Sequence, residues 1–175
     1  MVKTNKIFEK VNKMTATLRN MTSVYIFKGD RVLLLYRQGS RVVNNVWTGS
    51  AGGHFEDYEL NNPESCVIRE MKEELGIDRG SLETLQLRYI TLRNVKGEIR
   101  QNYFYFAELN RDYPDMIESN EGKAKWFDID EIADLEMPYT ARFVIEHYLE
   151  IGKFSQDTYV GVADGQKVQF VKIPA

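Results

Sequence analysis

The feature that most constrains this chain is one short helix with clearly marked ends. Asn62 can cap the helix, Pro63 suits its first position, and Glu64 favours the positive end of the helix dipole. Gly76 can adopt the left-handed conformation in which helices commonly end. Together these signals predict a helix over residues 63–75.

At about 100° per residue, this helix has an apolar sector and an acidic sector beside it. Arg69 lies one turn before Glu73, within reach of an ion pair. Like charges at i,i+4 cost an isolated helix only about 0.2–0.5 kcal/mol, so the acidic sector alone also fits a solvated surface. The apolar sector contains Val67, Ile68, Met71 and Leu75, and the acidic sector contains Glu70, Glu73 and Glu74.

Two glycines, Gly52 and Gly53, precede the helix and favour a metal site over a solvated surface. Glycine permits close approach of the backbone, and its carbonyl can act as a hard oxygen ligand. Carboxylates with a carbonyl form the kind of oxygen site that Mg²⁺, or alternatively Mn²⁺, occupies. One carboxylate could instead accept a proton from a metal-bound water. A structural or interaction module with a merely solvated acidic helix is the competing interpretation.

The sequence patterns in the rest of the chain predict several strands and a second long helix. A long helix with apolar residues at helical spacing is expected from Tyr139, and a short one over 128–135. The segment 37–53 is expected to be mostly loop with short extended pieces. Strands are predicted at 14–20, 21–27, 31–38, 82–95, 99–109 and 124–129, with a final hairpin over 157–173. This order indicates an α+β domain or an α/β/α layering.

Composition narrows the class of protein. The 175 residues suit one domain, and the net charge of −3 lacks the basic footprint of proteins that bind long nucleic acid. The single cysteine, Cys66, allows no intrachain disulfide and fits a reducing cytoplasm. No apolar run approaches the roughly 18 residues of a membrane span, and the polar start lacks the apolar core of a signal peptide. We therefore expect a cytoplasmic protein without a membrane segment.

The segment "REMKEELGI", residues 69–77, resembles the second half of the Nudix box. Gly53, followed after five residues by Glu59, matches the first half. Nine residues separate Glu59 from Arg69, where the family usually has seven, so the box over 53–77 carries a two-residue insertion that we place in "LNNP". The family's matching glutamate pairs with the box arginine. The insertion leaves the role of Glu59 open, with Glu56 as a substitute or additional ligand.

The resemblance implies a single MutT-like Nudix domain over 1–175, an α/β/α sandwich with a mixed sheet between helices. It implies a Mg²⁺-dependent hydrolase of phosphoanhydride bonds in nucleoside diphosphates linked to a group X. The Gly53 carbonyl, Glu73 and Glu74 would hold metal, Glu70 would be a ligand or the base, and Arg69 would orient the glutamates. A later acidic residue often completes such sites, and Glu121 is preferred to Glu118 because it lies in an "EG" pair ahead of a tryptophan.

Other residues are expected to meet a nucleotide substrate. Arg37 is the main candidate for the phosphates, with Arg93 and Arg100 as weaker ones, since hairpin-tip arginines are usually solvated. Sheet packing is the alternative for Tyr103 and Tyr105, and an exposed loop is expected around Trp47. The candidates for the nucleobase pocket are Asn20, Tyr25, Trp47, Tyr103, Tyr105, Met137 and Tyr139.

Size and layout favour a nucleoside triphosphate substrate, including oxidised purine nucleotides, with a monophosphate and pyrophosphate as products. ADP-ribose, sugar nucleotides and dinucleoside polyphosphates remain alternatives, as does a noncatalytic nucleotide-binding module. A homodimer is possible.

Overall fold

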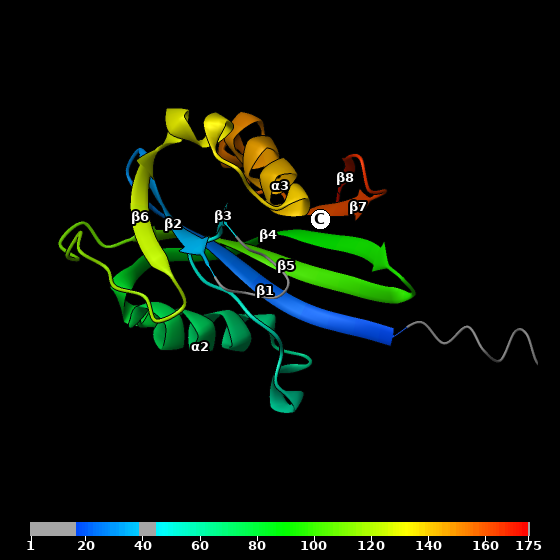
Figure 1. Cartoon of the computed structure of the whole chain (residues 1–175), viewed down its shortest axis with the longest axis horizontal. Coiled ribbons are helices and arrows are strands. Elements are labelled where there is room, and N and C mark those ends of the chain that lie inside the picture. The colour runs from blue at the N-terminus through cyan, green and yellow to red at the C-terminus, as the bar shows by residue number, and fades with distance from the viewer. Residues whose placement is uncertain (1–16, 39–44, 175) are drawn as a thin grey trace, which may run out of the picture.

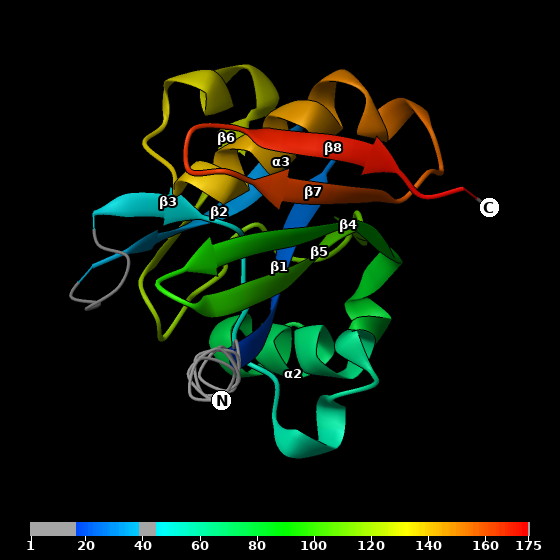
Figure 2. The same cartoon turned by 90° about the vertical axis from the view of Figure 1, so that its right-hand side faces the viewer.

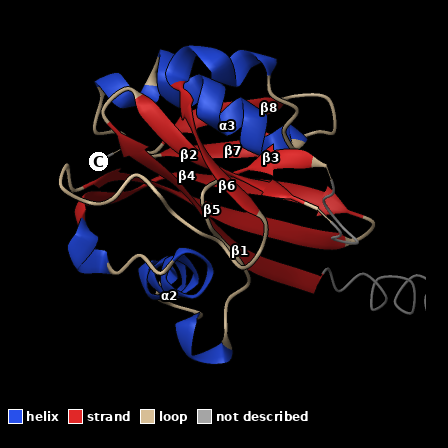
Figure 3. Cartoon of the chain, turned by 60° about the vertical axis from the view of Figure 1, so that its left-hand side comes forward, coloured by secondary structure: helices blue, strands red, loops and turns tan. Residues whose placement is uncertain are grey.

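One mixed sheet runs through the protein, with a helix on each of its faces (Figures 1 and 3). The computed structural model describes residues 17–38 and 45–174, and within them eight strands form the sheet in the order β3-β2-β1-β5-β4-β7-β8, while β6 also pairs with β2. The strands are β1 (Thr17–Lys28), β2 (Arg31–Arg37), β3 (Val46–Thr48), β4 (Leu82–Val95), β5 (Glu98–Leu109), β6 (Lys123–Asp128), β7 (Tyr159–Ala163) and β8 (Val168–Lys172). The pairs β1–β5 and β4–β7 are parallel and the others antiparallel, which confirms the predicted mixed sheet.

The predicted break near residue 20 does not exist, because β1 continues from Thr17 to Lys28. Residues 14–16 of the predicted first strand lie outside the described residues. The long strand is held by parallel pairing with β5 from Thr17 to Phe27. The strand ends at Lys28, and the next residue, Gly29, has a φ of 63° and forms the predicted turn into β2.

The helix α2 (Pro63–Leu75) has the predicted ends. The Asn62 side chain accepts a hydrogen bond from the Ser65 amide, and Gly76 is left-handed, with φ 69°. Its apolar face packs on one side of the sheet in a buried cluster that includes Val24, Ile26, Leu33, Val67, Met71, Leu75, Tyr105 and Leu109. This packing holds the acidic sector next to the glycine loop, whose Gly52 amide donates to the Glu74 carboxylate.

The helix α3 (Tyr139–Glu150) covers the opposite face (Figure 3). It packs in a second cluster that includes Tyr25, Phe27, Leu34, Tyr89, Phe106, Val144 and Ile145. The short helix predicted at 128–135 is a 3-10 helix, η3 (Ile129–Asp134). These layers confirm the α+β prediction.

The final hairpin, β7–β8, extends the sheet beyond β4 (Figure 2). The buried Arg88 holds the segment before it by donating to the carbonyls of Gly152, Ser155 and Asp157. Within the described residues, no helix is long and apolar enough to cross a membrane.

Candidate active site

Arg69 lies at the centre of an ion-pair network on α2. Its Nε is 2.8 Å from Glu59 Oε1 and its Nη2 is 2.9 Å from Glu59 Oε2. Its Nη1 lies 2.8 Å from Glu70 and 2.9 Å from Glu73. The Arg69 guanidinium, as the main cause, lowers the pKa of the Glu59 carboxyl, whose side chain is fully buried. Arg69 therefore positions three carboxylates at once.

Glu59 retains this contact despite the insertion. A 3-10 helix, η1 (Asp57–Glu59), brings it to Arg69, and the chain then turns through Leu60 and Asn61 before α2 begins. The backbone amide of Glu56 donates to Glu59 Oε2 at 2.9 Å, while the Glu56 side chain is exposed. Glu56 thus supports Glu59 and does not replace it.

Glu74 forms the second centre of the site. Its side chain is 7% exposed, and its carboxylate accepts hydrogen bonds from Arg37 Nη2 at 3.0 Å and from the Gly52 amide at 3.1 Å. Burial raises the pKa of Glu74 to about 7, and the charges of Glu70 and Glu121 add to the rise. The Glu121 carboxylate lies 3.9 Å from Arg37 Nη2. The structure thus brings Arg37, Glu74 and Glu121 together.

The glycine loop lies directly against these carboxylates. A Cβ on Gly53 would lie 2.2 Å from Glu70 Oε1, and a Cβ on Gly52, at φ 154°, would lie 2.3 Å from the Thr22 carbonyl oxygen. The Gly53 carbonyl accepts a hydrogen bond from the Thr22 amide at 2.9 Å. Among the described residues, the Gly52 carbonyl accepts none. The Gly52 carbonyl therefore has more freedom to bind a metal than the Gly53 carbonyl. The sequence did not single out Gly52 as a ligand.

The donors suit a hard divalent cation, since they are carboxylate and carbonyl oxygens. Burial, the largest cause, raises the pKa of Glu70 as it does that of Glu74, so a nearby cation would favour both charged forms. Within residues 17–38 and 45–174, no three acidic, histidine or cysteine side chains converge as a metal cluster. Arg69 instead holds Glu70 and Glu73, while Arg37 holds Glu74.

The loop that carries Glu118 and Glu121 lies beside the C-terminal end of α2. Asn120 Nδ2 donates to the Glu73 carbonyl at 2.9 Å. Glu118 lines a hollow there together with Glu73 and Glu74. Both loop glutamates are thus near the acidic sector, and Glu121 is the one near Arg37.

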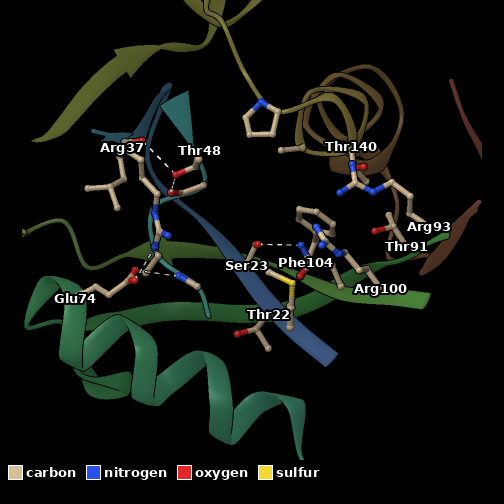
Figure 4. A pocket seen from close by; sticks show the side chains of 18 residues that line it. Thr22, Ser23, Arg37, Thr48, Glu74, Thr91, Arg93, Arg100, Phe104 and Thr140 are labelled. Carbon is tan, nitrogen blue, oxygen red and sulfur yellow. Dashed lines mark hydrogen bonds and ion pairs between the residues drawn. The ribbon is translucent and has the colours of Figure 1, made fainter. Parts of the chain in front are cut away.

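A cavity of about 370 Å³ opens beside Glu74, between the sheet and the start of α3 (Figure 4). Its walls come from the strands β1 to β5, the glycine loop, α2 and α3. Polar and charged residues on these walls are Thr22, Ser23, Arg37, Thr48, Glu74, Thr91, Arg93, Arg100, Asn102 and Thr140.

The residues predicted for the nucleobase, Tyr25, Tyr105 and Met137 included, do not line this cavity. Trp47 packs between Tyr36 and Phe127, with ring centroids 4.9 and 4.6 Å away, so the expectation that it is exposed was wrong. The short strand β3 turns it inward by pairing with β2.

Tyr103 stacks on Phe55 with ring centroids 5.5 Å apart, next to the α2 cluster, which agrees with the sheet-packing alternative. The Tyr139 hydroxyl donates to the Lys167 carbonyl in the β7–β8 turn. The Asn20 carbonyl accepts from the Phe55 amide at 3.3 Å, also away from the cavity lining.

Sequence reasoning missed several cavity residues that share one face of three strands. Ser23 on β1, Asn102 on β5 and Thr91 on β4 are brought together by strand register, and Thr140 closes the cavity from α3. Because side chains alternate between the two faces of a strand, the sequence could have predicted that Arg100, Asn102 and Phe104 share one face of β5. Which residues of β1 and β4 lie beside them depends on the strand pairing.

The comparisons agree with this geometry. A family model described as "NUDIX domain" matches residues 17–148, so the chain belongs to the Nudix family. With the box glutamates and arginine assembled as above, it is a hydrolase of phosphoanhydride bonds. The comparison with curated proteins gave no match.

Solved structures show the same fold. The mutator MutT protein of Bacillus halodurans is 21% identical, with a TM-score of 0.65, over 90% of this chain and 99% of the other. The dihydroneopterin triphosphate pyrophosphohydrolase of E. coli is 22% identical, with a TM-score of 0.61, over 77% and 98%. The Nudix domain of Shewanella oneidensis NrtR, solved with ADP ribose, is 14% identical, with a TM-score of 0.61, over 89% and 100%.

Proposed function

We propose that this protein is a Mg²⁺-dependent pyrophosphohydrolase of nucleoside triphosphates, oxidised purine nucleotides included, which releases a nucleoside monophosphate and pyrophosphate. The observation that carries the proposal is that Glu74 and Arg37 belong both to the acidic site and to the cavity wall. A nucleoside in the cavity would place its phosphates beside α2. Dinucleoside polyphosphates, sugar nucleotides and ADP-ribose are the competing substrates. A cytoplasmic location rests on the single cysteine.

We assign metal binding and phosphate binding to different residues of the site. Glu73, Glu74, Glu121 and the carbonyl of Gly52 or Gly53 would hold the metal. When bound, a divalent cation supplies charge stabilisation to the phosphate oxygens. Arg37 would bind phosphate oxygens through its planar guanidinium.

Glu70 is either a further ligand or the base that accepts a proton from the attacking water. Burial raises the pKa of Glu70, which makes its carboxylate a stronger base. The water oxygen would bond to one phosphorus as the anhydride P–O bond breaks. Arg69 would keep Glu70 and Glu73 in position without touching substrate.

The test is a substrate panel with Mg²⁺ or Mn²⁺ and identification of the products by chromatography. It contains normal and oxidised nucleoside triphosphates, ADP-ribose, sugar nucleotides and dinucleoside polyphosphates. Release of pyrophosphate with a monophosphate, at the highest kcat/KM for a triphosphate, supports the proposal. Preference for another member of the panel would overturn the substrate, and no metal-dependent hydrolysis of any member would overturn the activity.

A further inference from the structure

Three arginines form a row across the sheet at the far end of the cavity. Arg93 on β4 is directly opposite Arg100 on β5, and Arg100 is in register with Arg19 on β1. Like charges in directly opposite positions of neighbouring strands are destabilising. A ligand of opposite charge would offset this unfavourable arrangement.

The acidic groups nearby do not neutralise the row. Glu98 lies 2.6 Å from Arg100 Nε and 3.8 Å from Arg19 Nη1, so one carboxylate is shared between two cations. Within the described residues, Arg93 forms no ion pair or hydrogen bond with another side chain. Burial and the charge of Arg100 lower the pKa of Arg93. Arg93 is therefore a partly buried cation without a partner in the described part of the chain.

Arg93 and Arg100 line the same cavity as Arg37 and Glu74, but on the other side of it (Figure 4). Polar groups lie between the two sides. Asn102 Nδ2 donates to Ser23 Oγ at 3.1 Å. Asn102 Oδ1 and Thr140 Oγ1 are buried and have no hydrogen-bond partner among the described residues. Such groups commonly orient a ligand in a mostly apolar pocket.

We propose that Arg93 and Arg100 form a second anion subsite, which binds a phosphate group on the end of the substrate away from the phosphoanhydride. The inference rests on the proposed function, because it places the anhydride at Arg37 and Glu74. Among the proposed nucleoside triphosphates, it favours those that carry an additional phosphate, for example on the ribose. Guanidinium groups suit such a phosphate because they donate in a planar, bidentate arrangement.

The experiment uses pairs of nucleotides that differ only in the distal phosphate. The pair within the proposed substrate class is guanosine 5′-triphosphate 3′-diphosphate with GTP. Coenzyme A with 3′-dephospho-coenzyme A, and NADPH with NADH, test the same subsite on the competing class of nucleoside diphosphates linked to another group. Binding is measured by calorimetry and hydrolysis by kcat/KM, for the wild type and Arg93→Met. Arg93→Lys retains the charge, and Arg111→Met removes an exposed arginine beyond the opposite end of β5.

We expect the wild type to prefer the phosphorylated member of at least one pair by about tenfold or more. Arg93→Met should lose this preference, because its kcat/KM should fall much further on the phosphorylated member of the pair than on the other member. Arg93→Lys should retain part of it, and Arg111→Met all of it. Thermal unfolding should show Arg93→Met at least as stable as the wild type, since the mutation removes a like-charge pair.

Equal binding within every pair, or a preference that survives in Arg93→Met, would overturn the subsite. Absence of hydrolysis throughout would instead count against the proposed function, and the calorimetric comparison would still decide the subsite. The two failures are therefore distinguishable.

Discussion

Glu59 and Arg69 form a two-bond ion pair, at 2.8 and 2.9 Å, across nine intervening residues. The Glu59 carboxylate is fully buried, so it depends on this arginine for its charge compensation. The turn between η1 and α2 is where we predict the two-residue insertion, and α2 keeps its predicted ends. The pair thus fixes the loop of the box to the helix that carries the candidate site.

Replacing Glu59 by alanine should therefore destabilise the protein. Removal of one partner leaves the other charge unpaired, and the free energy of unfolding should fall by about 3 kcal/mol, the low end for buried pairs because Arg69 is partly exposed. Urea unfolding of both proteins measures the change. The matched control is Glu56→Ala, an exposed side chain three residues earlier, which should alter stability by about 0.5 kcal/mol or less. Equal losses in the two variants would contradict a special role for Glu59.

Replacing Glu74 by glutamine should nearly abolish Mg²⁺-dependent hydrolysis while the fold persists. The amide keeps the shape of the side chain but loses the charge on which cation binding and the Arg37 contact depend. We expect kcat/KM to fall roughly 100-fold or more, in keeping with several kcal/mol of lost charge stabilisation. Steady-state assays over a range of Mg²⁺ concentrations give the measurement. Glu64→Gln, at an exposed position of the same helix, should retain activity, and near-normal turnover of Glu74→Gln would sink the assignment.

The parts predictable from the sequence are those determined by local chemistry. The ends of α2 follow from Asn62, Pro63 and Gly76, each of which acts within a few residues. The hairpin turns follow in the same way from glycines with positive φ, as at Gly29. The spacing of the box residues was sufficient to predict Arg69 beside its glutamates.

The cavity could not be predicted because it depends on nonlocal pairing. Arg93 and Arg100 were only weaker phosphate candidates, because hairpin-tip arginines are usually solvated. In the structure both line a cavity to which the start of α3 contributes Thr140 and Ala141. Arg19 lies beside Arg100 because β1 and β5 pair in parallel. No short turn connects these two strands, so the local sequence does not determine their register. Trp47 looked exposed because its partner Phe127 is distant in sequence.

Gly53→Ala should reduce activity much more than stability. The added methyl group would meet the Glu70 carboxylate, the mobile end of a long side chain, so the side chain can move aside at little cost in folding. Its displacement would remove Glu70 from the position in which it acts as ligand or base. The comparison of kcat with the midpoint of urea unfolding separates the two effects. Gly80→Ala, where an added Cβ has no neighbour within 4 Å, is the control, and a Gly53→Ala enzyme with normal kcat would argue against Glu70.

His147 should make the protein less stable as the pH falls below about 6.5. Its ring packs against Tyr89, Tyr159 and Phe170, and the Tyr89 hydroxyl lies 2.8 Å from its Nδ1. Burial lowers the pKa of His147, while Glu150 partly opposes the shift. Because the unfolded chain takes up a proton near pH 6.5 and the folded protein resists it, acidification favours unfolding.

His147→Gln should accordingly lose less stability than the wild type between about pH 7 and pH 5. Urea unfolding at several pH values gives the two slopes, and their difference isolates His147 from groups common to both proteins. Burial is also the main cause that lowers the pKa of the second histidine, His54, which is hydrogen-bonded to Arg19. His54→Gln therefore tests a comparable group at another place in the fold. If the free energy of unfolding depended on pH equally in the wild type and in His147→Gln, the aromatic cluster would not impede protonation of this ring.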